Sequence, residues 1–293
     1  MRYLGIDAGA SATKWVLVDG AKVLLTGVAG PIDGHIQRAE SLDRMRSTLA
    51  EINSASGGDI QRVLIGITGI AEKDQERNHT IDVIKKIYTE ATVELEGDIH
   101  LAYRVHFKSG RGVLLYAGTG AVACTEIAGE LRRVGGWGYL LGDEGAGYWI
   151  GREAIRSLML YVDRGVRPPA GSMESEIAAA IGGDDWGIVK NFVYGKNRSE
   201  IASLARSVFQ YKEQESAINI LTQAADHLAD LVGRVDEITG DSSLEVLFTG
   251  GTSQGDGPLK DRLMQRLGSR VKVSDKNIAE GAAILAREAS SQG

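Results

Sequence analysis

The sequence has a single cysteine, Cys124, among its 293 residues. One cysteine excludes an intrachain disulfide and a cysteine-rich zinc or iron–sulfur site within one subunit. No run of apolar residues approaches the roughly 18 that are needed to cross a bilayer, and no signal peptide precedes the first predicted strand. We therefore expect a cytoplasmic protein without a membrane segment.

Positive charge is also scarce. The 33 Lys and Arg residues are outnumbered by 39 Asp and Glu residues, and no basic cluster is interleaved with aromatic residues. Neither a nucleic-acid partner nor a membrane surface is therefore expected. The length, with 43% hydrophobic and 25% charged residues, fits a globular protein, and we favour two medium domains.

The sequence does contain one repeated pattern, an apolar strand followed by a turn of small residues and a second strand. It occurs at residues 3–11 and again at 113–121. Glycine-rich turns let backbone N–H groups approach an anion closely, so two such turns can grip a polyphosphate. We expect an α/β fold with two related domains, residues 1–111 and 112–293, and the last helix can pack back on the first domain.

Hydrophobic periodicity predicts the remaining elements. Strands are expected at 2–6, 13–18, 22–26, 63–67, 93–95, 113–117, 122–127, 244–248 and 271–273. Helices are expected at 40–53, around 81–87, and at 145–161, 174–181, 199–211, 214–238, 258–267 and 279–287.

Two common nucleotide motifs can be excluded. The P-loop pattern that ends in Gly-Lys-Ser/Thr is absent. Gly118-Thr119-Gly120 resembles a dinucleotide fingerprint, but that motif must open a helix, whereas residues 122–127 are β-branched and predict a strand. Any phosphate-binding turn in this chain is therefore expected to be a turn between two strands of a β-hairpin.

The densest signal is the glycine-rich segment 135–151, which contains Trp137, Asp143, Glu144 and Trp149. The two carboxylates could simply cap a following helix. The segment closely resembles, however, the GGWGxxxGDEGSxxWI stretch of the N-acetylglucosamine kinases, within the BadF/BadG/BcrA/BcrD ATPase group.

The resemblance extends over nearly the whole chain. Residues 7–13 resemble the first phosphate motif of the family, residues 117–120 the second, and residues 248–252 the turn that lies against the adenosine. This implies an actin/hexokinase/Hsp70-type fold, in which two ribonuclease-H-like domains close on MgATP across an interdomain cleft. The implied nucleotide-binding residues are Gly9, Ala10, Ser11, Thr13, Gly118, Thr119, Gly120, Gly250, Gly251 and Thr252.

The resemblance also implies individual roles. Asp98 matches the aspartate that serves as catalytic base in the family, although it could instead cap the helix that follows it. Asp7, where the first strand meets its turn, could hold a magnesium ion or could bond its own backbone. Asp143 and Trp137 would contact the sugar, with Glu144 beside them.

One departure concerns the sugar. Family members often carry Gly-Pro-Ser/Ala-Asn where this chain has Gly30-Pro31-Ile32-Asp33. A carboxylate accepts hydrogen bonds but cannot donate them as an asparagine amide does. Asp33 could therefore favour a free amine, which makes glucosamine as plausible a substrate as N-acetylglucosamine.

The function implied by the resemblance is ATP-dependent transfer of the γ-phosphate to a hydroxyl of such an amino sugar, with ATP and Mg²⁺ as cofactors. Two alternatives remain open at this point: an activator-type ATPase of the BadF/BcrA group, and a protein that senses a sugar or nucleotide without chemistry. We further expect a homodimer, although the sequence does not determine the oligomeric state.

Overall fold

The computed structural model describes residues 1–9, 12–70, 74–107 and 111–290. It divides the chain into two compact units, one formed by Met1–Lys108 with Lys276–Gly293 and the other by Ser109–Asp275. The chain therefore passes between the units twice, and the last helix belongs to the first unit.

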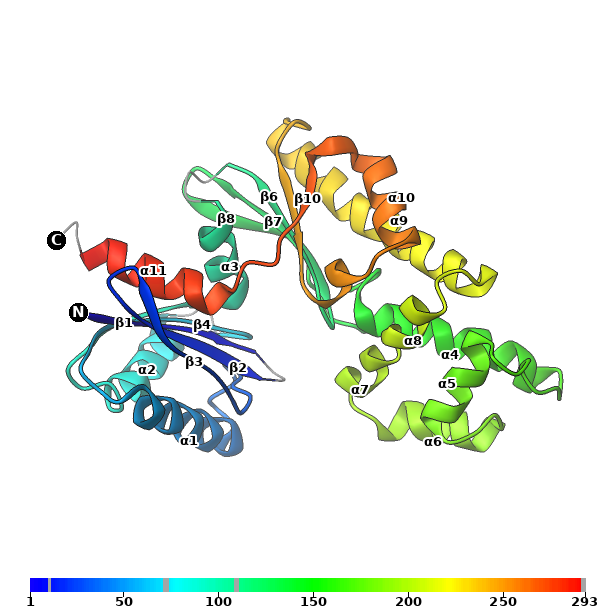
Figure 1. The fold of residues 1–293 in the computed structure, drawn as a ribbon, viewed down its shortest axis with the longest axis horizontal. Helices are drawn as coiled ribbons and strands as arrows, with labels where there is room; N and C mark the ends of the chain where they lie inside the picture. Colours follow the sequence, from blue (N-terminus) through cyan, green and yellow to red (C-terminus); the bar gives the residue numbers. More distant parts are fainter. Residues whose placement is uncertain (10–11, 71–73, 108–110, 291–293) are drawn as a thin grey trace. The chain divides into compact units, whose positions relative to one another are not determined.

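The first unit is a mixed five-stranded sheet with helices on both faces (Figure 1). The strand order is β3-β2-β1-β4-β5, in which β1, β2 and β3 are antiparallel neighbours and β1, β4 and β5 are parallel neighbours. The elements are β1 (Arg2–Ala8), β2 (Thr13–Asp19), β3 (Lys22–Ala29), α1 (Ala39–Ser56), β4 (Ile60–Ile67), α2 (Asp74–Lys85), β5 (Thr92–Gly97), α3 (Asp98–His106) and α11 (Ile278–Ser290).

The two faces of this sheet bury different helices. Side chains alternate along β1, so Leu4 and Ile6 pack with α1 and α2, whereas Tyr3 packs with α3 and α11. Gly5 lies under α11, where a Cβ atom would be 2.0 Å from the carbonyl oxygen of Ala279. Only a residue without a side chain allows this approach, which joins the C-terminal helix to β1.

The second unit has a sheet of the same size and a larger helical layer (Figure 1). The strand order is β10-β9-β6-β7-β8. The elements are β6 (Val113–Ala117), β7 (Ala121–Ile127), β8 (Glu130–Gly135), α4 (Gly147–Asp163), α5 (Met173–Ile181), α6 (Trp186–Gly195), α7 (Arg198–Ser203), α8 (Ala205–Gln210), α9 (Glu215–Thr239), β9 (Val246–Thr249), η1 (Gly251–Gln254), α10 (Pro258–Leu267), η2 (Gly268–Arg270) and β10 (Val271–Val273).

The two sheets have the same topology. In each, the first strand in sequence is central, with two antiparallel strands on one side and two parallel strands on the other. β1 is thus equivalent to β6, and each is followed in the chain by an antiparallel partner, β2 or β7. The predicted α/β fold with two related domains is confirmed.

Several helices differ from the sequence prediction. The segment 199–211 forms two helices, α7 and α8, divided at Leu204. Helix α6 was not predicted, and α2 begins earlier than the apolar spacing indicated and ends before Ile87. These are differences within the helical layers, so the order of the strands is unaffected.

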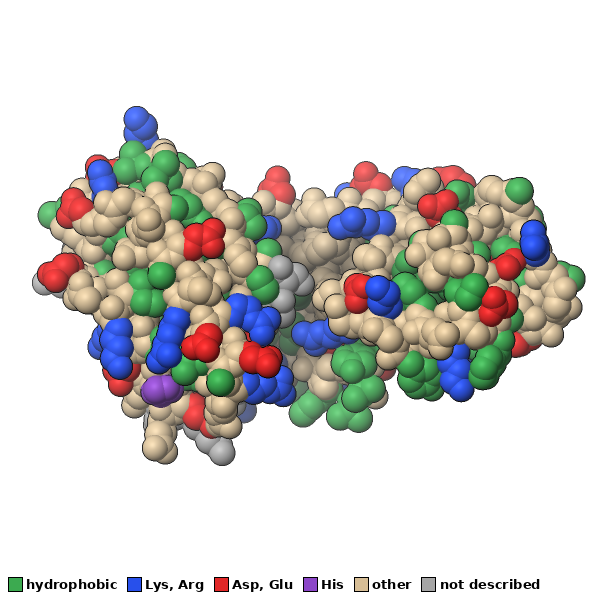
Figure 2. All heavy atoms as spheres, turned by 90° about the horizontal axis from the view of Figure 1, so that it is seen from below, with side chains coloured by type: hydrophobic (Ala, Val, Ile, Leu, Met, Phe, Trp, Pro, Cys, Tyr) green, Lys and Arg blue, Asp and Glu red, His purple; other side chains and the backbone are tan. Residues whose placement is uncertain are grey.

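Acidic and basic side chains are interspersed over the face shown in Figure 2, as expected for a net charge of −6 without a basic cluster. Within the described ranges, none of the helices is both long enough and apolar enough to span a membrane.

Candidate functional site

Asp7 and Asp98 lie at the carboxyl ends of parallel strands in the first unit. Asp7 is in register with Gly66 of β4, and Gly66 is in register with Glu96 of β5, two residues before Asp98. The Cα atom of Asp98 is 3.3 Å from the position that a Cβ atom of Gly66 would occupy. The missing side chain at Gly66 thus lets the start of α3 pack closely on β4, the strand that pairs with β1.

The two carboxylates interact electrostatically. Burial and, next in size, the negative charge of Asp98 raise the pKa of Asp7 to about 6, whereas Lys14 acts in the opposite direction. Like charges in a partly buried place favour a hard divalent cation with oxygen ligands. Among the described residues, no group of three or more His, Cys, Asp and Glu side chains is arranged to hold a metal ion.

Asp98 is also the first residue of α3, and its Oδ1 atom accepts a hydrogen bond of 2.9 Å from the backbone N–H of Ile99. The N-cap residue of α3 is Gly97, and no side-chain cap bond forms there, so the bond to Ile99 is a local contact in the first turn of the helix. One bond to one oxygen leaves the second carboxylate oxygen and further lone pairs for a substrate.

The turn between β1 and β2 contains the first predicted phosphate motif. Its Gly9 N–H donates to the carbonyl oxygen of Ala12 at 3.0 Å, while Ala10 and Ser11 lie outside the described residues. Thr13 is fully buried, and its Oγ1 atom has no hydrogen-bond partner among the described residues. A buried hydroxyl without a partner costs free energy, so Thr13 is a candidate ligand for a bound molecule.

Asp33 lies beside this turn, because the N–H of Ile32 donates to the carbonyl oxygen of Gly9 at 3.2 Å. The Asp33 carboxylate accepts hydrogen bonds from the His35 N–H at 3.1 Å and from the Ser41 hydroxyl at 3.3 Å. Asp33 therefore stabilises the loop that leads into α1, and each oxygen retains acceptor capacity.

In the second unit, the predicted phosphate turn 118–120 between β6 and β7 is attached to the start of α4. The Gly147 N–H donates to the carbonyl oxygen of Gly118 at 2.8 Å, and the Tyr148 N–H donates to that of Thr119 at 3.1 Å. These bonds fix the turn to the first residues of the helix.

The predicted adenosine turn is adjacent. Thr252 Oγ1 donates to the carbonyl oxygen of Ala117 at 2.8 Å, directly before the phosphate turn. Gly250 has φ 103°, and a Cβ atom there would lie 2.4 Å from the same oxygen. Within this unit, the residues predicted to hold the nucleotide at 118–120 and 250–252 are therefore neighbours.

Asp143 lies against this phosphate turn. Its side chain is buried, its backbone has φ 65°, and its Oδ1 atom accepts a hydrogen bond of 3.3 Å from the Ala121 N–H. Burial raises the pKa of Asp143, although that hydrogen bond and the charge of Arg198 partly oppose the shift. A left-handed conformation at a non-glycine residue is typical of functional sites.

A pocket of about 140 Å³ is lined by Trp137, Asp143 and Glu144 together. Trp137 is 73% exposed, and Glu144 is also exposed. Side chains of α9 form the opposite wall; these are His227, Asp230, Leu231 and Arg234. Sequence reasoning missed them because they occur within a regular helical pattern.

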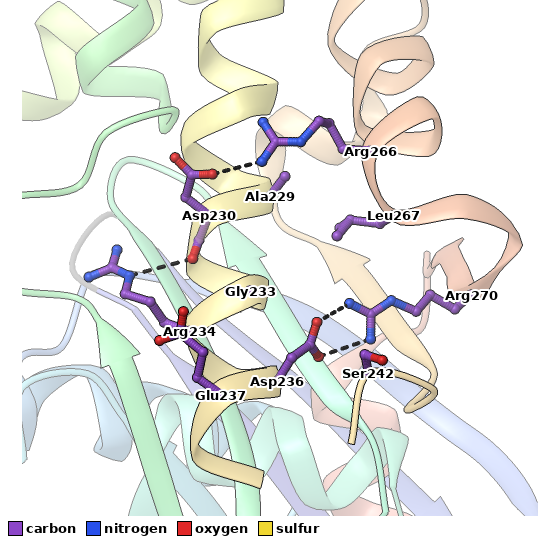
Figure 3. Close-up of a pocket in the computed structure, with 10 residues that line it drawn as sticks. All are labelled: Ala229, Asp230, Gly233, Arg234, Asp236, Glu237, Ser242, Arg266, Leu267 and Arg270. Carbon is purple, nitrogen blue, oxygen red and sulfur yellow. Dashed lines mark hydrogen bonds and ion pairs between the residues drawn. The ribbon is translucent and has the colours of Figure 1, made fainter. Parts of the chain in front are cut away.

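A second pocket, of about 590 Å³, lies between α9 and the α10–η2 segment (Figure 3). Arg266 pairs with Asp230 at 2.9 Å, and Arg270 pairs with Asp236 through both nitrogens of its guanidinium group. None of the predicted site residues lines this pocket. Because its acids and arginines largely neutralise each other, we regard it as a structural ion-pair network.

Comparison with known proteins identifies relatives of similar length. The chain is 28% identical to an N-acetylmuramic acid/N-acetylglucosamine kinase of Clostridium acetobutylicum, covering 98% of this chain and 99% of the relative. It is 25% identical to an N-acetyl-D-glucosamine kinase of Dictyostelium discoideum, with 90% and 89% covered.

The fold also matches a solved structure. A candidate N-acetylglucosamine kinase of Chromobacterium violaceum superposes with a TM-score of 0.74 at 22% identity, over 97% of this chain and 98% of the other. The model of the BadF/BadG/BcrA/BcrD ATPase family matches residues 4–286. The chain therefore belongs to the BadF/BadG/BcrA/BcrD ATPase family.

Proposed function

We propose that the protein is a kinase that transfers the γ-phosphate of ATP to a hydroxyl of an amino sugar. The observation that carries this proposal is the pair of carboxylates, Asp7 and Asp98, at the carboxyl edge of the first sheet. Asp7 is suited to binding a cation, and Asp98 is suited to accepting a proton. Phosphoryl transfer requires both functions from acidic side chains.

In the proposed reaction, Asp98 accepts the proton of the attacking sugar hydroxyl. The hydroxyl oxygen forms a bond to the γ-phosphorus, and the bond between that phosphorus and the β–γ bridging oxygen breaks. ADP leaves with the electron pair on the bridging oxygen. Asp98 also holds the hydroxyl in line, which is a large part of the catalytic effect in such reactions.

The nucleotide would be held by residues of both small-residue turns. Gly118, Thr119 and Gly120 offer backbone N–H groups to the phosphates, while residues 250–252 lie beside the adenosine. The Thr13 hydroxyl, which has no partner among the described residues, would gain a phosphate oxygen, and Gly9 would give room for this approach. Asp7 would hold Mg²⁺, which, when bound with ATP, neutralises phosphate charge.

The sugar would contact Trp137, Asp143 and Glu144. Their common pocket combines an aromatic wall with fixed carboxylates, as expected for an amphipathic ring with several hydroxyl groups. Asp33 would face the sugar nitrogen and favour a free amine. Glucosamine and N-acetylglucosamine are therefore both proposed substrates, and N-acetylmuramic acid, named for the Clostridium relative, belongs in the same panel.

The activator-type alternative is less well supported. An iron–sulfur cluster that bridges a dimer needs a pair of cysteine thiolates from each subunit. Cys124, the one cysteine of the chain, is buried in β7, where burial raises its pKa to about 12. Such a thiol is neither accessible nor ionised, so it is a poor cluster ligand.

The deciding experiment is an ADP-release assay with MgATP and the three amino sugars, with glucose as a control. We expect sugar-dependent ADP formation and a phosphorylated sugar in the product. Nucleotide binding without turnover on any sugar would favour the sensing alternative. A strong preference in kcat/KM for N-acetylglucosamine over glucosamine would refute the role of Asp33.

We also propose that the protein is a cytoplasmic homodimer. Light scattering coupled to gel filtration would measure the mass of the assembly, and fractionation of the source cells would locate it.

A further inference from the structure

Helix α7 packs directly against the start of α4. A Cβ atom at Gly147 would be 3.5 Å from the Cβ of Ala202, and one at Gly151 would be 2.1 Å from the carbonyl oxygen of Ile201. The backbones of the two helices therefore touch, and the position of α7 is set by two glycines of α4.

The same first residues of α4 hold the turn 118–120, since Gly147 donates to the carbonyl oxygen of Gly118. Ala202 therefore lies next to Gly147, the residue that donates a hydrogen bond to the turn. Arg198 precedes Ala202 by four residues, and side chains at this spacing lie on the same face of a helix. The face of α7 that meets α4 therefore carries Arg198 at its amino-terminal end.

Two further features connect the charge of Arg198 with this turn and leave it available. The charge of Arg198 lowers the pKa of Asp143, whose carboxylate accepts a hydrogen bond from the Ala121 N–H directly after the turn. Arg198 is exposed and makes no ion pair with another side chain in the described ranges. The Asn197–Glu200 capping box forms without the Arg198 side chain, so helix initiation does not require it.

The two turns that form the proposed nucleotide site in this unit carry no positive charge of their own. Residues 118–120 and 250–252 are uncharged, and Asp143 and Glu144 are acidic. A triphosphate carries several negative charges, and an arginine offers a permanent charge with a planar fork of donors that matches phosphate oxygens.

We propose that Arg198 is a catalytic residue that binds the phosphate chain of ATP at the turn 118–120 and stabilises the transferred phosphoryl group. This inference rests on the proposed kinase function. During transfer, Arg198 exchanges no proton: it donates hydrogen bonds to phosphate oxygens while the bond from the sugar oxygen to phosphorus forms and the bond to ADP breaks.

The test compares Arg198→Ala, Arg198→Lys and the matched control Arg206→Ala. Arg206 is an exposed arginine of the neighbouring helix α8 and has no ion-pair partner within the described part of the chain. We expect Arg198→Ala to lower kcat about 100-fold, the usual effect of losing one donor to transition-state charge. Arg198→Lys should lose less, and Arg206→Ala should match the wild type.

Calorimetry without sugar gives an independent readout. Arg198→Ala should weaken ATP binding about tenfold while leaving AMP binding unchanged, because AMP lacks the distal phosphates. If the wild type binds ATP but phosphorylates no amino sugar, the proposed kinase function is wrong. The comparison of ATP binding between Arg198→Ala and the wild type remains a valid test of this inference.

Three results would overturn the inference. The first is that Arg198→Ala keeps its ATP affinity and kcat within twofold of the wild type, and the second is that the wild type does not bind ATP. The third is that Arg198→Ala raises only the KM for the sugar. The last result would mean that Arg198 acts through Asp143 on the sugar. Thermal unfolding of all variants separates these outcomes from a failure to fold, and Arg198→Lys repeats the test with the charge retained.

Discussion

The Oδ2 atom of Asp143 lies 2.5 Å from the position at which a side chain at Gly120 would begin. The carboxylate therefore occupies the space that any other residue at position 120 would fill. Together with the hydrogen bond from Ala121, this contact joins the glycine-rich segment 135–151 to the phosphate turn, although the two are separated in the sequence.

Replacing Gly120 with alanine should break this relationship. The backbone at Gly120 is outside the left-handed region, so the cost comes from the clash with Asp143 rather than from φ. We expect the free energy of unfolding to fall by about 1–3 kcal/mol, as for other overpacked sites, together with weaker ATP binding. Urea unfolding and calorimetry would measure both.

The matched control is Gly233→Ala in α9, where a Cβ atom would meet nothing within 4 Å. Alanine is the better helix former, so this variant should gain about 0.5–1 kcal/mol. Wild-type stability and ATP affinity in Gly120→Ala would show that the turn can shift without loss.

Replacing Asp98 with asparagine tests the proposed base. The amide keeps the shape of the carboxylate but cannot take the proton of the sugar hydroxyl, so kcat should fall at least ~100-fold. ATP affinity, measured by calorimetry, should remain intact. Asp82→Asn, an exposed carboxylate on α2, serves as the control. An Asp98→Asn variant with wild-type turnover would remove Asp98 from the mechanism.

The succession of strands along the chain could be predicted from the sequence because its signals are local. Short apolar runs, alternating in some strands and continuous in others such as 63–67, mark the strands. Asp19-Gly20 marks the hairpin between β2 and β3, where Gly20 has φ 57°. The repeat of strand, small-residue turn and strand then indicates the duplication, since the same local pattern produces the same local structure.

Helix α6 shows where local signals fail. Its residues between Gly187 and Gly195 are mostly β-branched or aromatic, a composition that favours strands. The Asp185 side chain nevertheless starts a helix by accepting a hydrogen bond from the Ile188 N–H at 3.0 Å, and Val189 is buried in the core. Tertiary packing therefore decides the structure of this segment.

The sequence names candidate site residues, but it does not indicate their contacts. A motif match named Asp143, but nothing in the sequence indicates that its carboxylate lies against Gly120. Arg198 belongs to no motif, since Asn197 and Glu200 beside it predict only a helix start. Its relevance follows from the packing of α7 on α4, which depends on distant residues.

The raised pKa of Asp7 predicts a pH dependence of stability in the absence of Mg²⁺. Between its ordinary value of 3.8 and about 6, Asp7 is ionised in the unfolded chain but protonated in the folded protein. Its contribution to the free energy of unfolding is therefore fully present below pH 3.8 and is lost as the pH rises through 6, by about 3 kcal/mol.

Asp7→Asn should remove this dependence. The variant should be more stable than the wild type above pH 6 without Mg²⁺, because it no longer buries a charge and no longer places that charge beside Asp98. Mg²⁺ with ATP should raise the Tm of the wild type at pH 7.5 more than that of the variant. Parallel curves of unfolding free energy against pH for the two proteins would contradict the assigned coupling.

The ion pair between Arg270 and Asp236 predicts an effect on stability alone. Their side chains are 14% and 17% exposed, and two hydrogen bonds join them across the pocket between α9 and η2 (Figure 3). Arg270→Ala leaves the Asp236 carboxylate partly buried without its partner, which should lower the free energy of unfolding by about 2–3 kcal/mol.

The control variant is Arg132→Ala, which breaks the ion pair between Arg132 and Glu130. The side chains of this pair are 60% and 75% exposed, so its loss should lower the free energy of unfolding by less than about 0.5 kcal/mol. Kinase activity at low temperature should be unchanged in both variants; a loss of turnover in folded Arg270→Ala would mean that this pocket takes part in function.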